Sequence, residues 1–322
     1  MTRVQAIQPM ARYDKQPRVL MHIGLPKTGT TSLQTLLFDR HPEIRHFGQS
    51  NVWTNPDAKT VLRALLLDEE NNAKTAREHI SHALTQKTSV VISDEALSFG
   101  EFMLRARTWP IDSTPETVAA HTKEILGEAR ILMVLRNQLD WLISWHRQGL
   151  KTGKYTETKF KRWLERDLGS AQRDRLFELL DYNRLVAAYA DQFGAHNLDV
   201  RFYEDFRDDF PRLASEIAQT IDLNATEAHH LLANSPPANV TPPRFHGLPP
   251  ELHRLARTAA GQMVLERFPR RYRTVLRELF VCNRAYENIE ETTSQQIRAH
   301  FRAANSALRD RLGFERVPTC YA

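Results

Sequence analysis

Short apolar segments recur along the first two-thirds of the chain, and the stretches between them carry leucine, isoleucine and valine at helical spacing. Three of the segments are almost continuously apolar, which is typical of parallel strands buried on both faces, and the fourth alternates. They lie at 18–23, 89–92, 130–135 and 197–203. Strands separated by helices predict an α/β fold: a doubly wound parallel sheet flanked by helices, with right-handed crossovers.

Helix boundary signals refine this pattern. Thr114 before Pro115 is a strong helix start, and that helix is predicted to run to about Glu128. A long amphipathic helix is predicted from Leu176 through Ala190, with its end near Gly194.

The length of the chain, 322 residues, suits one large α/β domain or two smaller ones. We expect a loose polar tail over residues 1–17 and a single domain over 18–322. Its core is expected at 18–221, and a loop with a helical C-terminal part at 222–322. Residues 239–244 lie in a stretch rich in proline and asparagine and are candidates for a lid over a nucleotide.

Composition narrows the class of protein. The net charge of +5 suits a partner that is a charged nucleotide and leaves peripheral contact with an anionic membrane open, but no nucleic-acid motif accompanies it. No stretch has the length of a transmembrane span, and the first residues lack the apolar core of a signal peptide, so we expect a cytoplasmic protein. Two cysteines, Cys282 and Cys320, fit a reducing compartment.

The stretch from Gly24 to Ser32 carries the main chemical signal. It joins the first predicted strand to a helix, and two glycines bound it. Backbone N–H groups and the positive end of a helix dipole then form a cradle for an anion. The common phosphate loop of ATP and GTP hydrolases places lysine directly after its second glycine, whereas Thr30 stands there and the lysine is Lys27. An ordinary strand-to-helix turn with a capping hydroxyl is the alternative interpretation.

This loop resembles the 5′-phosphosulfate loop of sulfotransferases that use 3′-phosphoadenosine 5′-phosphosulfate (PAPS), above all bacterial sulfotransferase-domain proteins related to carbohydrate sulfotransferases. The resemblance implies PAPS as co-substrate, no requirement for a metal, and Lys27 as the group that neutralises the leaving phosphosulfate. The implied nucleotide-binding residues of the loop are Lys27, Thr28, Gly29, Thr30, Thr31 and Ser32.

A second segment, which begins at Arg136 directly after the third apolar run, resembles the family's 3′-phosphate motif. The resemblance implies that Arg136 and Ser144 bind the 3′-phosphate, for which a planar guanidinium and a hydroxyl are suited. Gln138 and His146 depart from the family's proline and tyrosine. The alternative interpretation is structural, with Arg136 paired to Asp140.

The second apolar run delivers Ser93, Asp94 and Glu95 to the same edge of the predicted sheet. A carboxylate there could deprotonate an acceptor, and the resemblance points to Glu95. Asp94 competes for that role, as do the histidines at positions 22 and 146. A helix N-cap formed by these residues is the structural alternative.

The sequence therefore predicts a PAPS-dependent sulfotransferase acting on a hydroxyl or amine acceptor. A glutamate base resembles that of the carbohydrate enzymes, so the acceptor is expected to be a glycan or glycolipid. A phosphate-loop kinase is the first alternative, and a nucleotide-binding module without catalysis is the second. The cysteines and histidines do not form a zinc-binding pattern, so no metal ligands are predicted.

Overall fold

The computed structural model describes residues 18–48, 50–52, 54–66, 70–87, 89–99, 114–152, 154–155, 157, 159–167, 170–234 and 289–321. The predicted tail and the candidate lid at 239–244 lie outside these residues, as does Cys282. Two compact units make up the chain. The first comprises Met1–Arg136, Asp181–Ala238 and Ala303–Ala322, and the second Asn137–Leu180 and Asn239–Arg302. A single domain over 18–322 stays a prediction.

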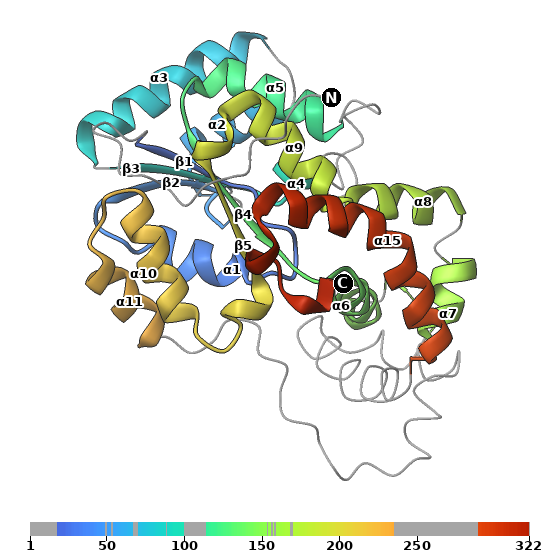
Figure 1. The fold of residues 1–322 in the computed structure, drawn as a ribbon. Helices are drawn as coiled ribbons and strands as arrows, with labels where there is room; N and C mark the ends of the chain where they lie inside the picture. Colours follow the sequence, from blue (N-terminus) through green and yellow to red (C-terminus); the bar gives the residue numbers. More distant parts are fainter. Residues whose placement is uncertain are drawn as a thin grey trace, which may run out of the picture. The chain divides into compact units, whose positions relative to one another are not determined.

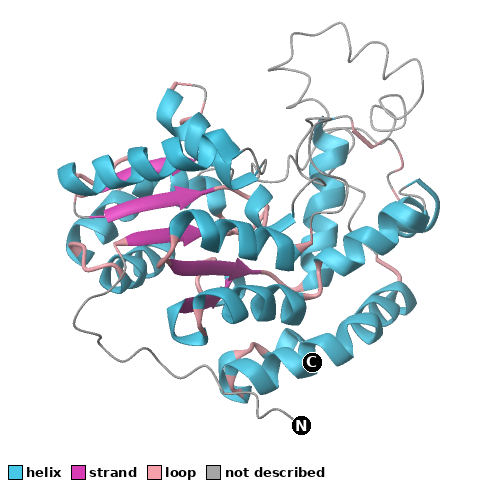
Figure 2. Ribbon diagram, turned by 90° about the horizontal axis from the view of Figure 1, so that it is seen from above, coloured by secondary structure: helices cyan, strands magenta, loops and turns pink. Residues whose placement is uncertain are grey.

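The first unit contains a five-stranded sheet in the order β2-β3-β1-β4-β5, and every pair of neighbours is parallel. Figure 2, seen from above, shows the strands running the same way. The strands are β1 (Val19–His22), β2 (Ile44–Gly48), β3 (Ser89–Ser93), β4 (Arg130–Leu135) and β5 (Leu198–Phe202). From β1 the chain builds β2 and β3 on one side and then β4 and β5 on the other. The order therefore reverses at β1, and such sheets bind ligands beyond the carboxyl ends of strands at this point.

Helices cover both faces of the sheet, which confirms the predicted doubly wound α/β fold (Figure 1). One face carries α2 (Pro56–Leu66), α3 (Glu70–Gln86), α5 (Pro115–Leu126) and α9 (Tyr182–Phe193). The other carries α1 (Thr30–Ser32), α10 (Phe210–Thr220) and α11 (Ala225–Ala233). The π-helix η1 (Leu33–Phe38) continues α1, and its Leu37 and Phe38 join Leu20 and Val91 of the strands in one buried core.

Short elements and the C-terminal part complete the described chain. The short ones are α4 (Ala96–Phe99), η4 (Ala195–Asn197), η5 (Tyr203–Asp205), η7 (Phe314–Arg316) and η8 (Thr319–Tyr321). The helix α15 (Glu291–Leu312) confirms a helical C-terminal region where the structure describes it.

The second unit contains α6 (Gln138–Thr152), α7 (Phe160–Arg162), the π-helix η3 (Trp163–Asp167) and α8 (Ser170–Leu179). Its core is aromatic. Trp141 and Trp163 are fully buried, and the ring of His146 stacks on Trp163 at 4.6 Å between centroids.

Two elements differ from the sequence-based expectation. The strand β2 was not predicted, because Ile44 and Phe47 are its only large apolar residues and an edge strand needs fewer of them. The long helix predicted from Leu176 through Ala190 is two helices, α8 and α9. The break comes at Asp181, whose carboxylate accepts a hydrogen bond from the Arg184 N–H and caps α9.

Candidate functional site

Three neighbouring strands bring the predicted residues of the first unit to one edge of the sheet. The loop after β1 carries Lys27, the turn after β3 carries Glu95, and β4 is followed at once by Arg136. Because β1 lies between β3 and β4 and all three are parallel, their carboxyl ends adjoin. The fold therefore collects these side chains although they lie far apart in the sequence.

The backbone of the loop turns through two left-handed residues. Gly29 has φ 85° and ψ 9°, which glycine adopts without steric cost. Lys27 has φ 68°, a conformation that costs a residue with a β-carbon about 1 kcal/mol or more. Left-handed residues in such loops turn backbone N–H groups toward an anion. Strain held at Lys27 fits a position whose geometry serves a ligand rather than stability.

The hydroxyl groups of the loop divide into two sets. Thr28 and Thr30 are buried, and both donate to the Leu25 carbonyl, at 2.5 and 3.0 Å. These two bonds hold the loop in shape. Thr31 is exposed and Ser32 half-buried, and both lie in the first helical turn after Gly29, where the Ser32 N–H donates to the Gly29 carbonyl at 2.9 Å. The second pair is therefore better placed to meet a phosphate than the first.

The two adjacent carboxylates after β3 have different partners. Asp94 is buried, and its Oδ1 accepts a hydrogen bond from the Ala96 N–H at 2.7 Å, so it caps α4. Burial raises the pKa of Asp94 to about 6, against the effect of that hydrogen bond. Burial also raises the pKa of Glu95, to about 7, and the nearby Asp94 charge adds to the shift.

Glu95 meets the loop through its electrostatic surroundings. The Lys27 ammonium and a hydrogen bond with the Thr30 hydroxyl both lower its pKa, although burial and Asp94 outweigh them. The structure thus brings together the predicted base, the predicted loop lysine and Thr30. A carboxyl group with a pKa of about 7 exchanges a proton readily near neutral pH, as general acid–base chemistry requires.

Arg136 is tied to the loop. Its Nη1 donates to the Lys27 carbonyl at 2.9 Å, and its guanidinium lies 4.8 Å from the centre of the Tyr203 ring. The Arg136 carbonyl accepts a hydrogen bond from the Tyr182 hydroxyl at 2.6 Å. Arg136 therefore holds the strained Lys27 backbone in place, whatever else its remaining N–H groups bind.

The other half of the predicted 3′-phosphate motif belongs to the second unit. Ser144 is a half-buried residue of α6, and Asp140 lies in the first turn of the same helix. His146 is buried, and its Nε2 lies 2.8 Å from the Glu157 carbonyl. Burial lowers the pKa of His146 to about 4, so its imidazole is neutral and held by the core of this unit.

His22 is likewise a poor proton acceptor. It is fully buried in β1, and burial, with a smaller effect from His46, lowers its pKa to about 3. Its Nδ1 lies 2.8 Å from the Ser93 hydroxyl oxygen. Of the four candidate bases, Glu95 combines a pKa of about 7 with an electrostatic interaction with Lys27, and its role as base stays a prediction.

Sequence reasoning missed several residues that shape this site. A β-carbon at Gly29 would lie 2.2 Å from the Phe210 ring, so this aromatic residue from α10 packs directly against the loop. The Gln34 side chain reaches from η1 to Ser93. Neither contact leaves a local pattern in the sequence, because Gln34 reaches Ser93 on a neighbouring strand and Phe210 comes from α10.

The described residues contain neither a metal-binding cluster nor a membrane-spanning helix. Within that part of the chain, no cluster of three or more histidine, cysteine, aspartate or glutamate side chains is arranged to hold a metal ion. No helix in the same residues is both long enough and apolar enough to cross a membrane.

Comparisons with known proteins address the family. The model of the sulfotransferase family matches residues 20–227, while no curated protein matches. Two solved structures align at low similarity. A sulfotransferase from Alicyclobacillus acidocaldarius is 15% identical, with a TM-score of 0.46, 80% of this chain covered and 99% of that chain. The sulfotransferase domain of the Synechococcus PCC 7002 olefin synthase is 14% identical, with a TM-score of 0.42 and coverage of 84% and 97%. Because the family model spans more than half of the sequence, the chain belongs to the sulfotransferase family.

Proposed function

We propose that this protein transfers the sulfuryl group of PAPS to a hydroxyl or amine acceptor, with Glu95 as the general base. The electrostatic interaction between Glu95 and the loop lysine carries the proposal. A carboxyl group with a raised pKa lies within electrostatic reach of Lys27, in the loop that resembles the phosphosulfate loop of sulfotransferases. Such pairs of base and cation are typical of functional sites rather than of ordinary loops.

The residues of the chain fit the donor. Left-handed backbone at Lys27 and Gly29 favours an anion, and the first turn of α1 offers Thr31 and Ser32. PAPS supplies an activated sulfuryl group on a phosphate leaving group. Lys27 neutralises charge on the oxygen that separates from sulfur, and Arg136 with Ser144 selects nucleotides that carry a 3′-phosphate.

Glu95 takes the proton of the acceptor as its oxygen or nitrogen forms a bond to sulfur. The S–O bond to the phosphate breaks in the same displacement, and adenosine 3′,5′-bisphosphate leaves. A pKa of about 7 lets Glu95 be ionised at the start of the reaction and hold the proton at its end. We extend the proposal to a sugar hydroxyl or amine as acceptor, because the glutamate resembles the base of the carbohydrate enzymes.

Sulfur-labelled PAPS tests this function directly. The purified chain is incubated with the label and a panel of glycans, glycolipids, amines and phenols, and transfer is compared with that of Glu95→Gln. We expect a labelled glycan or amine product from the wild type and loss of transfer in the variant, with nucleotide affinity retained. Transfer at the wild-type rate by Glu95→Gln would exclude the glutamate mechanism.

A thermal-shift comparison separates the proposal from a phosphate-loop kinase. Adenosine 3′,5′-bisphosphate should raise the melting temperature without magnesium, and ATP with magnesium should not. The opposite result favours a kinase. A shift with the bisphosphate but no transfer to any acceptor, including water, favours a binding module.

A further inference from the structure

Two strand ends in the first unit share the same short arrangement. β1 ends in His22 two residues before Gly24, and β2 contains His46 two residues before Gly48. Both imidazoles are buried, and in both the Nε2 atom has no hydrogen-bond partner among the described residues. Each glycine leaves room for that atom. A β-carbon would lie 2.5 Å from His22 Nε2 at Gly24, and 2.1 Å from His46 Nε2 at Gly48.

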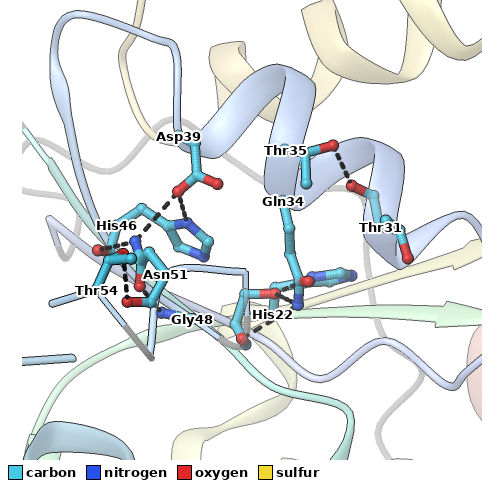
Figure 3. Close-up of polar contacts among 10 residues, drawn as sticks. His22, Thr31, Gln34, Thr35, Asp39, His46, Gly48, Asn51 and Thr54 are labelled. Carbon is cyan, nitrogen blue, oxygen red and sulfur yellow. Dashed lines mark hydrogen bonds and ion pairs between the residues drawn. The ribbon is translucent and has the colours of Figure 1, made fainter. Parts of the chain in front are cut away.

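Two residues near the same helix reach the two histidines, one of them through Ser93 and the other directly (Figure 3). The π-helix η1 is closed by a hydrogen bond from the Asp39 N–H to the Gln34 carbonyl at 2.9 Å, so these two residues lie one π-turn apart. Gln34 bonds to Ser93, the partner of His22, and Asp39 Oδ1 lies 2.7 Å from His46 Nδ1. A regular α-helix would turn residues five apart to different sides, so the π-turn is what brings both to the sheet.

The hydrogen bonds around Ser93 favour one tautomer of His22. The Gln34 Nε2 donates to the Ser93 carbonyl at 3.2 Å, which can only accept, and to the Ser93 hydroxyl oxygen at 2.9 Å. The Ser93 hydroxyl is therefore free to donate its own proton to His22 Nδ1, 2.8 Å away. A neutral imidazole that accepts at Nδ1 carries its proton on Nε2. His22 thus presents an N–H group to the side of Gly24.

These contacts connect the parts of the proposed active site. Ser93 precedes the turn that carries Glu95, and His22 precedes the phosphate loop. The space beside Gly24 lies between His22 Nε2 and the Thr30 hydroxyl, since a β-carbon there would be 3.0 Å from Thr30 Oγ1. The Thr30 hydroxyl also acts on Glu95, whose pKa it lowers.

We propose that Gln34, Ser93 and His22 are positioning residues that set Glu95 against the phosphate loop. The inference rests on the proposed sulfuryl transfer for its kinetic effect. The network holds the strand end that carries the base, the entrance to the loop and the helix after the loop in one arrangement. The pair of Asp39 and His46 has the same local geometry, but its further bonds run to Asn51 in the turn after β2. It therefore serves as an internal control.

The decisive variant is Ser93→Ala, which removes the connecting hydroxyl at almost unchanged volume. We expect kcat to fall about 10- to 100-fold while the KM for PAPS changes less than about threefold, since misplacement of the base affects the chemical step. Asp39→Asn, the matched control, should leave kcat within about twofold, because the further bonds of this pair run to Asn51 rather than toward Glu95. An unchanged kcat in Ser93→Ala, or an equal loss in Asp39→Asn, would overturn the assignment.

Substitution of His22 tests the polar contact rather than the packing. His22→Asn keeps an oxygen that can accept from the Ser93 hydroxyl, and His22→Leu does not. Partial rescue by asparagine relative to leucine supports a positioning role, and equal loss in both, with both folded, contradicts it.

A readout without turnover separates this inference from the proposed function. Nitrogen-15 spectra of the histidine rings should show His22 as the Nε2–H tautomer in the wild type and as a mixture in Ser93→Ala. If no acceptor is ever sulfated but this tautomer is found, the proposed function fails and the network stands without its kinetic role. If the Nδ1–H tautomer is found in the wild type, the network is wrong even when transfer is active.

Discussion

The two halves of the expected nucleotide site differ in how far the described structure assembles them. On the 5′ side, Lys27, Thr30 and Glu95 follow two strand ends of one unit, and Lys27 and Thr30 both lower the pKa of Glu95. On the 3′ side, Arg136 is the last residue of the first segment of the first unit, and Ser144 belongs to the second unit. Arg136 moreover holds the Lys27 carbonyl. The predicted 3′-phosphate ligand Arg136 thus also supports the 5′ loop, because its side chain donates to the backbone carbonyl of Lys27.

The largest expected effect tests the 5′ side. Glu95→Gln should reduce transfer by about 100- to 10,000-fold, because a positioned base contributes that much to a proton-transfer step. Initial rates with labelled PAPS measure it. Asp94→Asn is the control: asparagine can still cap α4, so the rate should stay within about tenfold of the wild type. Equal losses in both variants would assign the base to the pair rather than to Glu95.

Glu95→Gln should also change the stability of the folded chain in a pH-dependent way. The pKa of Glu95 is raised from 4.5 to about 7 in the folded chain, so the folded state binds the proton more tightly than the unfolded state. The resulting stabilisation is complete below pH 4.5 and is lost as the pH rises through 7. Glu95→Gln avoids the cost of the buried charge and should be more stable than the wild type at pH 8, by at most about 3 kcal/mol. Urea unfolding at pH 5 and pH 8 checks the sign.

Removal of the loop charge should have the next largest effect. Lys27→Ala is expected to slow transfer about 100- to 1,000-fold, as loss of a single group that stabilises developing charge does. Because Lys27 lowers the pKa of Glu95, the rise of the rate with pH should also move to higher pH in this variant. Lys27→Asn tolerates the left-handed backbone without the charge and should lose as much activity. If Lys27→Asn is active, the backbone conformation rather than the ammonium is what matters. Lys123→Ala, on an exposed ion pair, is the control.

These contrasts show where sequence reasoning succeeds. The strands β1, β3 and β4 were predicted nearly to the residue, because burial on both faces leaves a run of apolar residues that few other structures need. The loop and Glu95 stay predictions, which rest on residue types that are rare after a buried strand. β2 was missed because an edge strand can hold Arg45 and His46.

The supporting contacts could not be found in this way. Gln34 reaches Ser93 only because η1 is a π-helix and because β3 lies beside β1, and neither fact leaves a local pattern. Phe210 meets Gly29 through the packing of α10 on the sheet. Such residues depend on long-range geometry, whereas motifs record only neighbours along the chain.

Substitution of Arg136 separates its two roles. Arg136→Lys keeps a charge but loses the planar fork, so affinity for adenosine 3′,5′-bisphosphate should fall about 10- to 100-fold. Titration calorimetry measures the affinity of the variant for the bisphosphate and for adenosine 5′-phosphate. A loss confined to the bisphosphate supports 3′-phosphate recognition. An equal loss for both nucleotides would mean that the bond to Lys27 is the main contribution of Arg136.

The smallest expected effect tests whether Ser144 and Arg136 bind the same phosphate. Ser144→Ala removes one neutral hydroxyl, for which a loss of about 1 kcal/mol in bisphosphate affinity is typical. In the double variant with Arg136→Lys, residues that bind the same phosphate should show a coupling energy of at least about 0.5 kcal/mol, whereas independent sites should be additive. Calorimetry of the two single variants and the double variant measures this term. Additivity would remove Ser144 from the 3′-phosphate site, whereas coupling would support Arg136 and Ser144 as ligands of the same phosphate.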